Sequence, residues 1–410
     1  MKSVNQNVLV INGGSSSIKF ALYDMDDKLN KILFGQIKKI GLDNSEFTVT
    51  HNLINEEKER KINVTNFKEA SEVLMEWLKE QKCFEEIICI GHRIVHGMEH
   101  THSEIIDDNL LKELYKITHF DPAHLPAEIA MIELFKKQFP NLLQVACFDT
   151  FFHTTLPKMA KAFALPKKYY DEDVKRYGFH GISYSYLMDE LRKENEGEAK
   201  GRIILAHLGN GASLAAVKEG KCLDTSMGFT PAGGIVMSTR SGDLDPGVSW
   251  YLMQQGLNAE TFNDLINHQS GLLGISGYSS DMQDLLQHEK DNENAALAID
   301  IFCYQIKKYI GAYTAALSGL DTLVFSGGIG ENATVIRSRI CKGFEYLGIE
   351  IDEAENQKNA RIISTKNSKV KVYVIPTDEE IMIAKSTQKL YITPHTTRPS
   401  SSESGWGEAN

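Results

Sequence analysis

The stretch VLVINGGSSSIKFALYD, Val8 to Asp24, joins two apolar, strand-like runs through a loop of two glycines and three serines, with Lys19 just beyond it. Glycines let a backbone approach a ligand closely, successive N–H groups form an anion-binding nest, and serine hydroxyls add donors. The loop is not a Walker A motif, because Phe20 rather than serine or threonine follows Lys19. A lone Gly/Ser hairpin is more often a simple turn, so phosphate binding here requires support from the rest of the chain.

The same pattern of strand, small-residue turn and strand returns in the second half of the chain. RIILAHLGNGASLAAVKEG, residues 202–220, has an apolar run, the polar residue His207, a glycine turn and another apolar run. Each copy begins roughly half of the chain, which predicts two similar domains, 1–195 and 196–390, connected through the charged stretch RKENEGEAKG. Residues 391–410 are rich in proline, serine and glycine, and we expect a flexible tail to which no function is assigned.

The 410-residue chain is 42% hydrophobic and carries a formal net charge of −11. This balance predicts large cores and argues against nucleic-acid binding, which requires a basic face. Strand-like runs such as TLVFSGG alternate with helical ones such as PAEIAMIELFKKQF, which indicates an α/β fold. The six cysteines form no CxxC pair, and neither a membrane-spanning run nor a signal peptide is present, so we expect a cytoplasmic protein without membrane partners.

A third glycine-rich segment, LVFSGGIGENA, follows an apolar strand. We expect a Gly-Gly-Ile-Gly turn here, after which Glu331 and Asn332 open a helix. Backbone N–H donors and a helix N-terminus would then meet at one point, which suits an anion or a nucleotide. Each loop is a weak signal alone, but the two hairpin loops and this turn together predict phosphate binding in a cleft between the domains.

Five further segments place charge beside strands or turns: GHRIVHG, VACFDTFFH, RYGFHG, TRSGDLDP and IPTDEE. An arginine at the end of a strand can bind a carboxylate or phosphate through two parallel hydrogen bonds. Simpler interpretations stay open, since an arginine and an aspartate in one turn usually pair, and a DEE triplet is often a helix N-cap. No zinc-ligand spacing occurs, and carboxylates beside phosphate loops suit Mg²⁺.

In combination and in order, these motifs resemble the acetate/propionate kinase family of the actin-like ATPase superfamily, from Val8 to Lys389. The resemblance implies an α/β fold of two duplicated ribonuclease-H-like domains with an interdomain cleft, assembled as a homodimer. It also implies reversible transfer of the ATP γ-phosphoryl group to acetate, giving acetyl phosphate and ADP, with Mg²⁺ or Mn²⁺.

The family motifs carry functional roles onto matching positions. The catalytic positions are Arg93, Asp149, His180 and Arg240; the acyl-substrate positions are Arg93, Val95, His124, Phe179 and Pro231; the metal positions are Asn12 and Glu379. The nucleotide positions are Ser15, Ser17, Lys19, His207, Leu208, Gly209, Asn210, Gly211, Asp281, Met282, Gln283, Gly328, Ile329, Gly330, Glu331 and Asn332. Since the acceptor carboxylate is ionised near pH 7, we expect Asp149 to orient Arg93 or a metal-bound water rather than to move a proton.

The sequence departs from the family pattern near the substrates. Ala123 replaces a leucine of the acyl pocket, which favours propionate, whereas the retained Val95 favours acetate. Gln283 replaces an arginine of a nucleotide segment, and Tyr184 replaces a histidine. Propionate or a broader range of short-chain carboxylates is therefore the alternative acceptor. A sugar or glycerol kinase would not need two arginines, and a non-enzymatic actin-like protein would lack the four catalytic positions.

Overall fold

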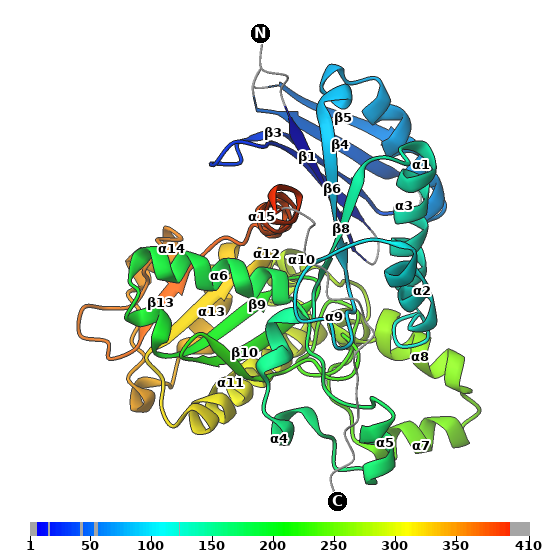
Figure 1. Ribbon diagram of the computed structural model, residues 1–410. Helices are drawn as coiled ribbons and strands as arrows, with labels where there is room; N and C mark the ends of the chain where they lie inside the picture. The colour runs from blue at the N-terminus through cyan, green and yellow to red at the C-terminus, as the bar shows by residue number, and fades with distance from the viewer. Residues whose placement is uncertain (1–5, 15–16, 42–43, 53–55, 123, 394–410) are drawn as a thin grey trace, which may run out of the picture.

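The structure, a computed structural model, describes residues 6–14, 17–41, 44–52, 56–122 and 124–393 (Figure 1). Two β-sheets form its framework. The first contains β1 (Asn7–Gly13), β2 (Ile18–Asp24), β3 (Lys31–Lys38), β4 (Ser45–His51), β5 (Glu56–Ile62), β6 (Ile87–Ile94), β7 (Glu104–Ile105) and β8 (Leu143–Phe148). The second contains β9 (Arg202–Leu208), β10 (Ala212–Lys218), β11 (Lys221–Thr225), β12 (Thr322–Ser326) and β13 (Lys371–Val374).

Both sheets follow one strand plan. The order is β5-β4-β3-β2-β1-β6-β8-β7 in the first sheet and β11-β10-β9-β12-β13 in the second. In each, an antiparallel hairpin, β1–β2 or β9–β10, continues into a third antiparallel strand. The first strand of each hairpin is flanked on its other side by two parallel strands. This repeat confirms the predicted α/β class and the duplication indicated by the two hairpin sequences.

Strands that the sequence predicts are buried, whereas a strand that it does not predict is exposed. β1 and β10 are buried along almost their whole length, and both were expected from apolar runs. β5 instead reads EEKERKI and forms the exposed edge of the first sheet. Charged side chains on an edge strand prevent it from pairing with another sheet, so β5 protects the edge of the first sheet. Because β5 has no run of apolar residues, the sequence does not predict it as a strand.

Helices cover both sheets (Figure 1). The periodic segments expected to be helical are α2 (Asp108–Lys116), α3 (Leu125–Gln138), α6 (Gly181–Glu194), α11 (Glu293–Leu317) and α15 (Glu379–Ile392). The others are α1 (Phe67–Lys79), α4 (Lys158–Lys161), α5 (Lys167–Asp171), α7 (Pro246–Gln254), α8 (Ala259–His268), α9 (Gly271–Ser276), α10 (Met282–His288), α12 (Gly327–Asn332), α13 (Thr334–Cys341) and α14 (Glu353–Gln357). Short 3-10 helices occupy Lys82–Glu86, Phe151–Thr155, Glu198–Lys200 and Glu345–Leu347.

The GGIG segment corrects one prediction. It is not a turn before a helix that opens at Glu331, because α12 already begins at Gly327, directly after β12 ends at Ser326. Gly327 has φ +76°, and a Cβ there would lie 2.7 Å from the Leu208 carbonyl oxygen. Only glycine therefore allows the chain to turn from the strand into the helix at this point.

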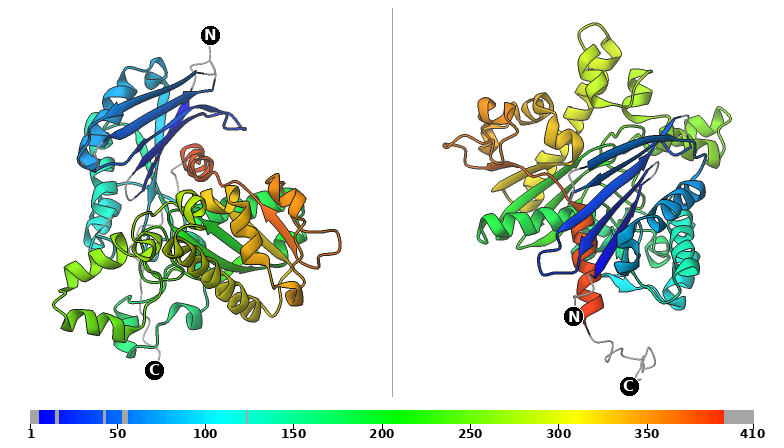
Figure 2. Two further views of the ribbon diagram at one scale, coloured as in Figure 1. Left: turned by 180° about the vertical axis from the view of Figure 1, so that it is seen from behind. Right: turned by 90° about the horizontal axis from the view of Figure 1, so that it is seen from above.

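Two helices cross between the sheets. α6 follows β8 of the first sheet, yet its Leu187 packs in one cluster with Leu205 of β9. α15 follows β13 of the second sheet, yet its Ile383 packs against the first sheet, where a Cβ on Gly91 would lie 2.3 Å from Thr387 Oγ1. Figure 2 shows α15, in red, against the blue strands. The domain boundaries expected near residues 195 and 390 stay predictions.

None of the helices in the described part of the chain is long and apolar enough to cross a membrane. The six cysteines are free thiols, and five of them are buried. The predicted tail from residue 394 onward lies outside the described residues, and α15 extends to Ile392.

Candidate active site between the two sheets

The tip of the β1–β2 hairpin places Asn12 opposite Lys19. The backbone N–H of Gly14 donates to the Ser17 carbonyl oxygen at 2.8 Å and closes the turn. Ser15, predicted to bind phosphate, lies outside the described residues. Lys19 is exposed, and its charge acts on His207 of β9 and on Glu380 of α15.

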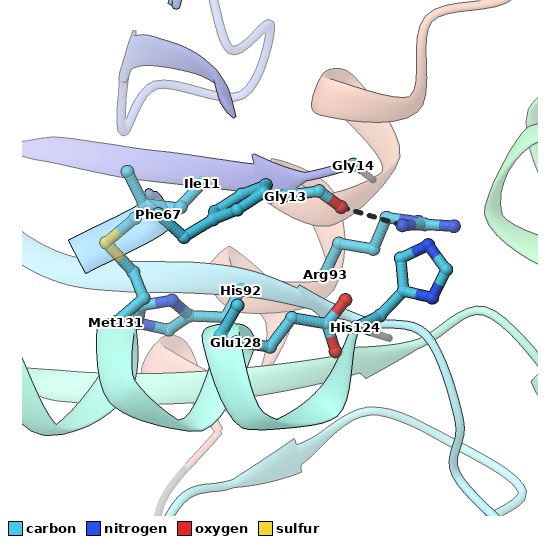
Figure 3. A pocket seen from close by; sticks show the side chains of 10 residues that line it. Ile11, Gly13, Gly14, Phe67, His92, Arg93, His124, Glu128 and Met131 are labelled. Carbon is cyan, nitrogen blue, oxygen red and sulfur yellow. Dashed lines mark hydrogen bonds between the residues drawn. The ribbon is translucent and has the colours of Figure 1, made fainter. Parts of the chain in front are cut away.

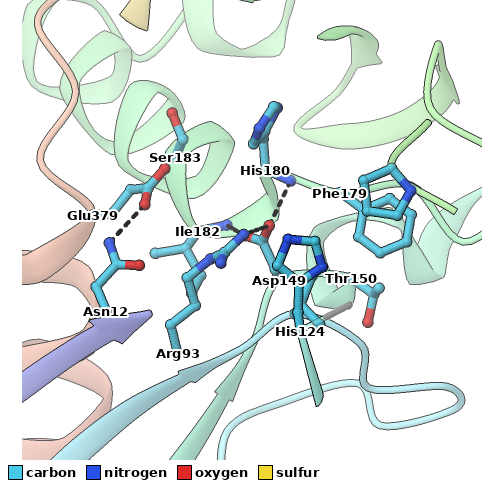
Figure 4. A network of polar contacts seen from close by, with 12 residues as sticks. Asn12, Arg93, His124, Asp149, Thr150, Phe179, His180, Ile182, Ser183 and Glu379 are labelled. Carbon is cyan, nitrogen blue, oxygen red and sulfur yellow. Dashed lines mark hydrogen bonds and ion pairs between the residues drawn. The ribbon is translucent and has the colours of Figure 1, made fainter. Parts of the chain in front are cut away.

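Asn12 connects the hairpin to the first turn of α15. Its Nδ2 donates to Glu379 Oε2 at 2.9 Å, as Figure 4 shows, and to Glu380 Oε1 at 3.0 Å. Burial raises the pKa of the Glu380 carboxyl, and the charges of Glu379 and Asp378 raise it further. Carboxylate and amide oxygens are therefore concentrated here, and the charge of Lys19 opposes the rise in the pKa of Glu380. The prediction named Glu379 and omitted Glu380, although the DEE triplet contained both.

Arg93, near the end of β6, is fixed from two sides. Its Nη2 donates to Asp149 Oδ2 at 2.8 Å, and its Nη1 donates to the Gly13 carbonyl oxygen at 2.8 Å (Figures 3 and 4). Only 12% of the Arg93 side chain and none of the Asp149 side chain is exposed. The guanidinium group is thus held between the hairpin tip and a buried carboxylate.

Asp149 also organises the start of α6. Its Oδ2 accepts a second hydrogen bond from the His180 backbone N–H at 2.8 Å, and its Oδ1 accepts one from Ile182 at 3.3 Å. Its carbonyl oxygen accepts from Gly181, where a Cβ would lie only 2.4 Å from that oxygen. The carboxylate is therefore occupied as an acceptor. This agrees with the orienting role expected for Asp149, which stays a prediction.

The rings of His180 and His207 stack, with centroids 4.3 Å apart. His180 Nδ1 lies 2.9 Å from Ser213 Oγ, and His207 Nδ1 lies 2.8 Å from Ser183 Oγ. Burial lowers the pKa of both rings, and for His180 the neighbouring His207 and arginines lower the pKa further. Both imidazoles are therefore neutral near pH 7 in the free protein. The two serines were not predicted, because only the folded chain reveals their partners.

The Arg240 and His180 side chains both approach Gly211. A Cβ on Gly211 would lie 3.1 Å from His180 Nε2 and 3.5 Å from Arg240 Nη1. Among the described residues, no carboxylate lies within ion-pair distance of Arg240, whose Nη1 donates to the Pro231 carbonyl oxygen at 3.3 Å. Burial lowers the pKa of Arg240, and Asp121 opposes this shift. An anion beside Gly211 would supply the partner that this guanidinium lacks.

The expected acyl-pocket residues lie around these charges. Val95 directly follows β6, Phe179 precedes His180, and both are almost fully buried. Pro231 contacts Arg240 through its carbonyl group. His124 lies beside the Arg93 guanidinium in Figures 3 and 4, and its Nδ1 lies 2.9 Å from Asp121 Oδ1. Ala123, whose small size favoured propionate, lies outside the described residues.

Two of the predicted nucleotide segments, 207–211 and 328–332, adjoin. A Cβ on Gly209 would lie 3.8 Å from both the Gly328 nitrogen and His207 Nε2, so the β9–β10 loop touches the start of α12. Glu331 Oε1 accepts from the Gly327 nitrogen at 2.8 Å and from the Thr377 nitrogen at 3.0 Å. This carboxylate therefore holds α12 against the segment that leads into α15.

The predicted nucleotide segment 281–283 lies at the start of α10. Asp281 caps α10 through hydrogen bonds to the backbone nitrogens of Gln283 and Asp284, and Met282 is buried. Gln283 is exposed, so its side chain is the part of this segment that remains available to a ligand. The Asp281 backbone N–H also donates to Ser279 Oγ, just before α10, at 3.2 Å.

A cavity beside Arg93 is lined by Ile11, Phe67, Met131 and Glu128 among others (Figure 3). Glu128 Oε2 accepts from the Val95 nitrogen at 3.0 Å, whereas Oε1 has no hydrogen-bond partner among the described residues. Burial raises the pKa of the Glu128 carboxyl to about 8, and Arg93 opposes this shift. Glu128 was not predicted, because no local pattern shows that an acid in an amphipathic helix is buried.

Other charged residues highlighted by the motifs are structural. Asp378 caps α15 by accepting from the Ile381 nitrogen at 2.9 Å, as the simpler interpretation of DEE proposed. Asp243 accepts from the Gly234 nitrogen at 2.8 Å and does not pair with Arg240. Arg176 donates to a row of backbone carbonyl groups.

Comparison with known proteins decides the family. The sequence model of the Acetokinase family matches residues 7–385. The chain belongs to the acetokinase family. It is 44% identical over 400 residues to the acetate kinase of Carboxydothermus hydrogenoformans, covering 94% of this chain and 99% of the relative.

Solved structures agree with this assignment. The crystal structure of Porphyromonas gingivalis acetate kinase has a TM-score of 0.84 and 40% identity, covering 94% of this chain and all of that one. A propionate kinase from Francisella tularensis has a TM-score of 0.87 and 38% identity, covering 94% and 99%. The α/β fold class is confirmed, and this acetokinase-family chain is a kinase.

Proposed function

We propose that this enzyme transfers the γ-phosphoryl group of ATP reversibly to acetate, forming acetyl phosphate and ADP. The observation that carries the proposal is a convergence of donors: His180 Nε2 and Arg240 Nη1 approach the space beside Gly211, and Asp149 Oδ2 binds both Arg93 and the His180 backbone. Phosphoryl transfer spreads charge over the equatorial oxygens of the transferred group, so catalysis depends on positioning and on charge stabilisation.

The state of Asp149 supports a carboxylate acceptor over a hydroxyl acceptor. A sugar or glycerol kinase must remove a proton from a neutral hydroxyl, which requires a carboxylate free to act as a base. Asp149 instead accepts from Arg93, His180 and Ile182. Acetate is already ionised near neutral pH and needs no base, whereas its negative charge needs the two guanidinium groups.

Asn12 and Glu379 would hold Mg²⁺, or Mn²⁺, in this proposal. The oxygen donors at this point, and the raised pKa of Glu380 beside Glu379, fit a site that a divalent cation would stabilise. Among the described residues, no group of three or more His, Cys, Asp or Glu side chains could hold a metal. Mg²⁺ usually keeps waters and nucleotide phosphates as ligands, and when bound it neutralises phosphate charge.

Trapping the acyl phosphate with hydroxylamine tests the proposal. With ATP and Mg²⁺, the purified enzyme should give acyl hydroxamate from acetate, and kcat/KM should be compared for acetate, propionate and butyrate. A methylene is worth about 1–3 kcal/mol in such a pocket, so we expect measurable but slower turnover of propionate. A higher kcat/KM for propionate than for acetate would make propionate the acceptor. If none of the short acids gave a hydroxamate, the proposed function would be wrong.

We further propose a homodimer formed through α7 and α8. Neither helix contains a buried residue, and both stand away from the main body in Figure 2. Trp250 is 66% exposed and Tyr251 is 58% exposed on α7, and aromatic side chains are enriched at subunit interfaces. Light scattering should give a dimer, and Trp250→Glu should dissociate it, whereas Tyr304→Glu on α11, equally exposed, should not. A dimer that survives Trp250→Glu would refute this interface.

The free thiols support a reducing, cytoplasmic location for the enzyme. Cell fractionation with a tagged full-length chain would test it. Recovery in a membrane or extracellular fraction would contradict it.

A further inference from the structure

Tyr184 and Ser213 form a buried hydrogen-bonded pair behind the His180 ring. Tyr184, on α6, places its hydroxyl 2.5 Å from Ser213 Oγ, on β10. The same Oγ lies 2.9 Å from His180 Nδ1. Tyr184 and Ser213 are both fully buried. A continuous chain of three polar groups therefore runs from the interior to the ring whose Nε2 faces the space beside Gly211.

The direction of the protons follows from the available acceptors. Within the described part of the chain, Ser213 Oγ is the only side-chain atom that hydrogen-bonds to the Tyr184 hydroxyl. Burial raises the pKa of Tyr184 far above its usual value, so it remains a donor. If Tyr184 did not donate to Ser213, a buried O–H would lack an acceptor, at a cost of about 1–3 kcal/mol. Ser213 then accepts from Tyr184 and directs its own hydrogen to His180 Nδ1.

We infer that Tyr184, acting through Ser213, is a positioning residue that keeps the neutral His180 ring in the tautomer with its proton on Nε2. This ring then presents an N–H donor, rather than a lone pair, to the transferring phosphoryl group beside Gly211. The wrong tautomer would place an acceptor against phosphoryl oxygens and repel them. The inference rests on the proposed phosphoryl transfer for its kinetic consequence but not for the tautomer itself.

The packing of Tyr184 makes a clean test possible. Its ring contacts Phe152 and His153, with centroids 5.6 and 5.7 Å away, so Tyr184→Phe keeps the ring and removes only the hydroxyl. Tyr313→Phe is the matched control, because the buried Tyr313 hydroxyl has no hydrogen-bond partner among the described residues. Ser213→Ala removes the middle group of the chain.

The first measurement is the ¹⁵N NMR spectrum of the His180 ring in the free enzyme, which needs no turnover. The wild type and Tyr313→Phe should show the Nε2–H tautomer, and Tyr184→Phe and Ser213→Ala should show a mixture with Nδ1–H. An unchanged tautomer in both Tyr184→Phe and Ser213→Ala overturns the inference. If the wild type makes no acyl phosphate, the proposed function fails while this result still decides the tautomer.

The second measurement is kcat with acetate. Tyr184→Phe should lower kcat about tenfold, since one hydrogen bond is lost from the chain. Ser213→Ala should lower kcat about 100-fold, and the double variant should be no slower than Ser213→Ala, because both act through His180. The KM for acetate should change little. Additive losses in the double variant, or wild-type kcat in Tyr184→Phe, would contradict the proposed action of Tyr184 through Ser213 on His180.

Discussion

The β1–β2 and β9–β10 hairpins occupy the same place in two sheets of one plan, yet they present different groups. The first ends in Asn12 and Lys19, beside the acids that open α15. The second ends in His207 and the two glycines, Gly209 and Gly211, beside α12. One hairpin therefore presents an amide and an ammonium group, and the other presents a histidine and a glycine loop that His180 and Arg240 approach.

The parallel strands differ in the same manner. β6 of the first sheet leads to the Arg93 guanidinium, whereas its counterpart β12 leads directly into the glycine turn of α12. β8 leads to Asp149, whose oxygens are occupied by donors, and its counterpart β13 leads to Glu379, which contacts Asn12. The duplication supplies matching positions for side chains, and substitution at those positions supplies different chemistry in each half.

The largest expected effects come from replacing the arginine that each half contributes to the site, Arg93 in the first half and Arg240 in the second. Arg240→Leu should lower kcat by about 10²–10⁴ with little loss of stability, because no carboxylate among the described residues pairs with Arg240. Arg93→Leu should lower kcat similarly and also destabilise the fold by about 3–5 kcal/mol, because the buried Asp149 carboxylate would lose its cationic partner and keep only backbone donors. Initial rates and urea unfolding would measure the two effects.

A second substitution sharpens this comparison. Asp149→Asn in the Arg93→Leu background should recover part of the lost stability without recovering activity, since the uncompensated charge is gone. Equal unfolding free energies for the two arginine variants would show that the halves do not differ as described.

The next effect concerns the acids of the second half that meet the first hairpin. Glu379→Gln should raise the Mg²⁺ concentration required for half-maximal rate by about 10–100-fold, because a charged oxygen beside Asn12 is lost. Asp378→Asn is the control, since asparagine still caps α15. The Mg²⁺ concentration for half-maximal rate would be measured for both variants by titrating the initial rate with Mg²⁺. An equal increase in Asp378→Asn would show that Glu379 is not a metal ligand.

A smaller effect compares the two loops through their glycines. Gly211→Ala should lower kcat about tenfold or more, because the new methyl group would lie 3.1 Å from His180 Nε2. Gly14→Ala should cost less activity, since the atom in its way, Ser17 Oγ at 3.2 Å, can rotate. Gly311→Ala in α11 meets no atom within 4 Å and should leave kcat unchanged. Steady-state rates that rank the two loops in reverse would refute this geometry.

The smallest expected effect is the pH dependence of stability caused by Glu128, which lies in the first half. The pKa of Glu128 is raised from 4.5 to about 8, so folding favours its protonated form. That contribution to stability is complete below pH 4.5 and is lost as the pH rises towards 8. Glu128→Gln should therefore have a Tm near that of wild type at pH 5 and about 2–4 °C higher at pH 8.

Glu133→Gln serves as the control for Glu128, since Glu133 lies exposed on the same helix, α3. Its Tm should follow that of wild type from pH 5 to pH 8. A Tm difference for Glu128→Gln that stays constant across this range would mean that Glu128 does not titrate as described.

The sequence predicts the centre of each sheet better than its edges. Buried strands such as β1 and long periodic helices such as α11 can be predicted from the spacing of their apolar residues. β5 has a single apolar residue, Ile62, and the apolar residues of α7 and α8 cover no core, since neither helix contains a buried residue. The GGIG turn was misjudged because nothing local shows that the Leu208 carbonyl approaches Gly327.

Sequence motifs identified several residues of the candidate site but not the contacts between them. Motifs located Arg93, Asp149 and His180, yet the sharing of one carboxylate oxygen between Arg93 and the His180 backbone depends on how β6, β8 and α6 pack. The same holds for Tyr184 and Ser213, which lie on different elements. Local patterns identify the chemistry, whereas distant chain segments decide which atoms meet.

The packing of α15, which follows the second sheet, against the first sheet affects how the chain folds during its synthesis. Strands β1, β6 and β8 leave the ribosome long before Glu379–Ile392, the helix that covers one of their faces. Until translation finishes, that apolar face has no cover, and a nascent chain in this state is prone to self-association. Expression of residues 6–378 should accordingly yield insoluble product, and a supplied peptide of the last helix should rescue solubility.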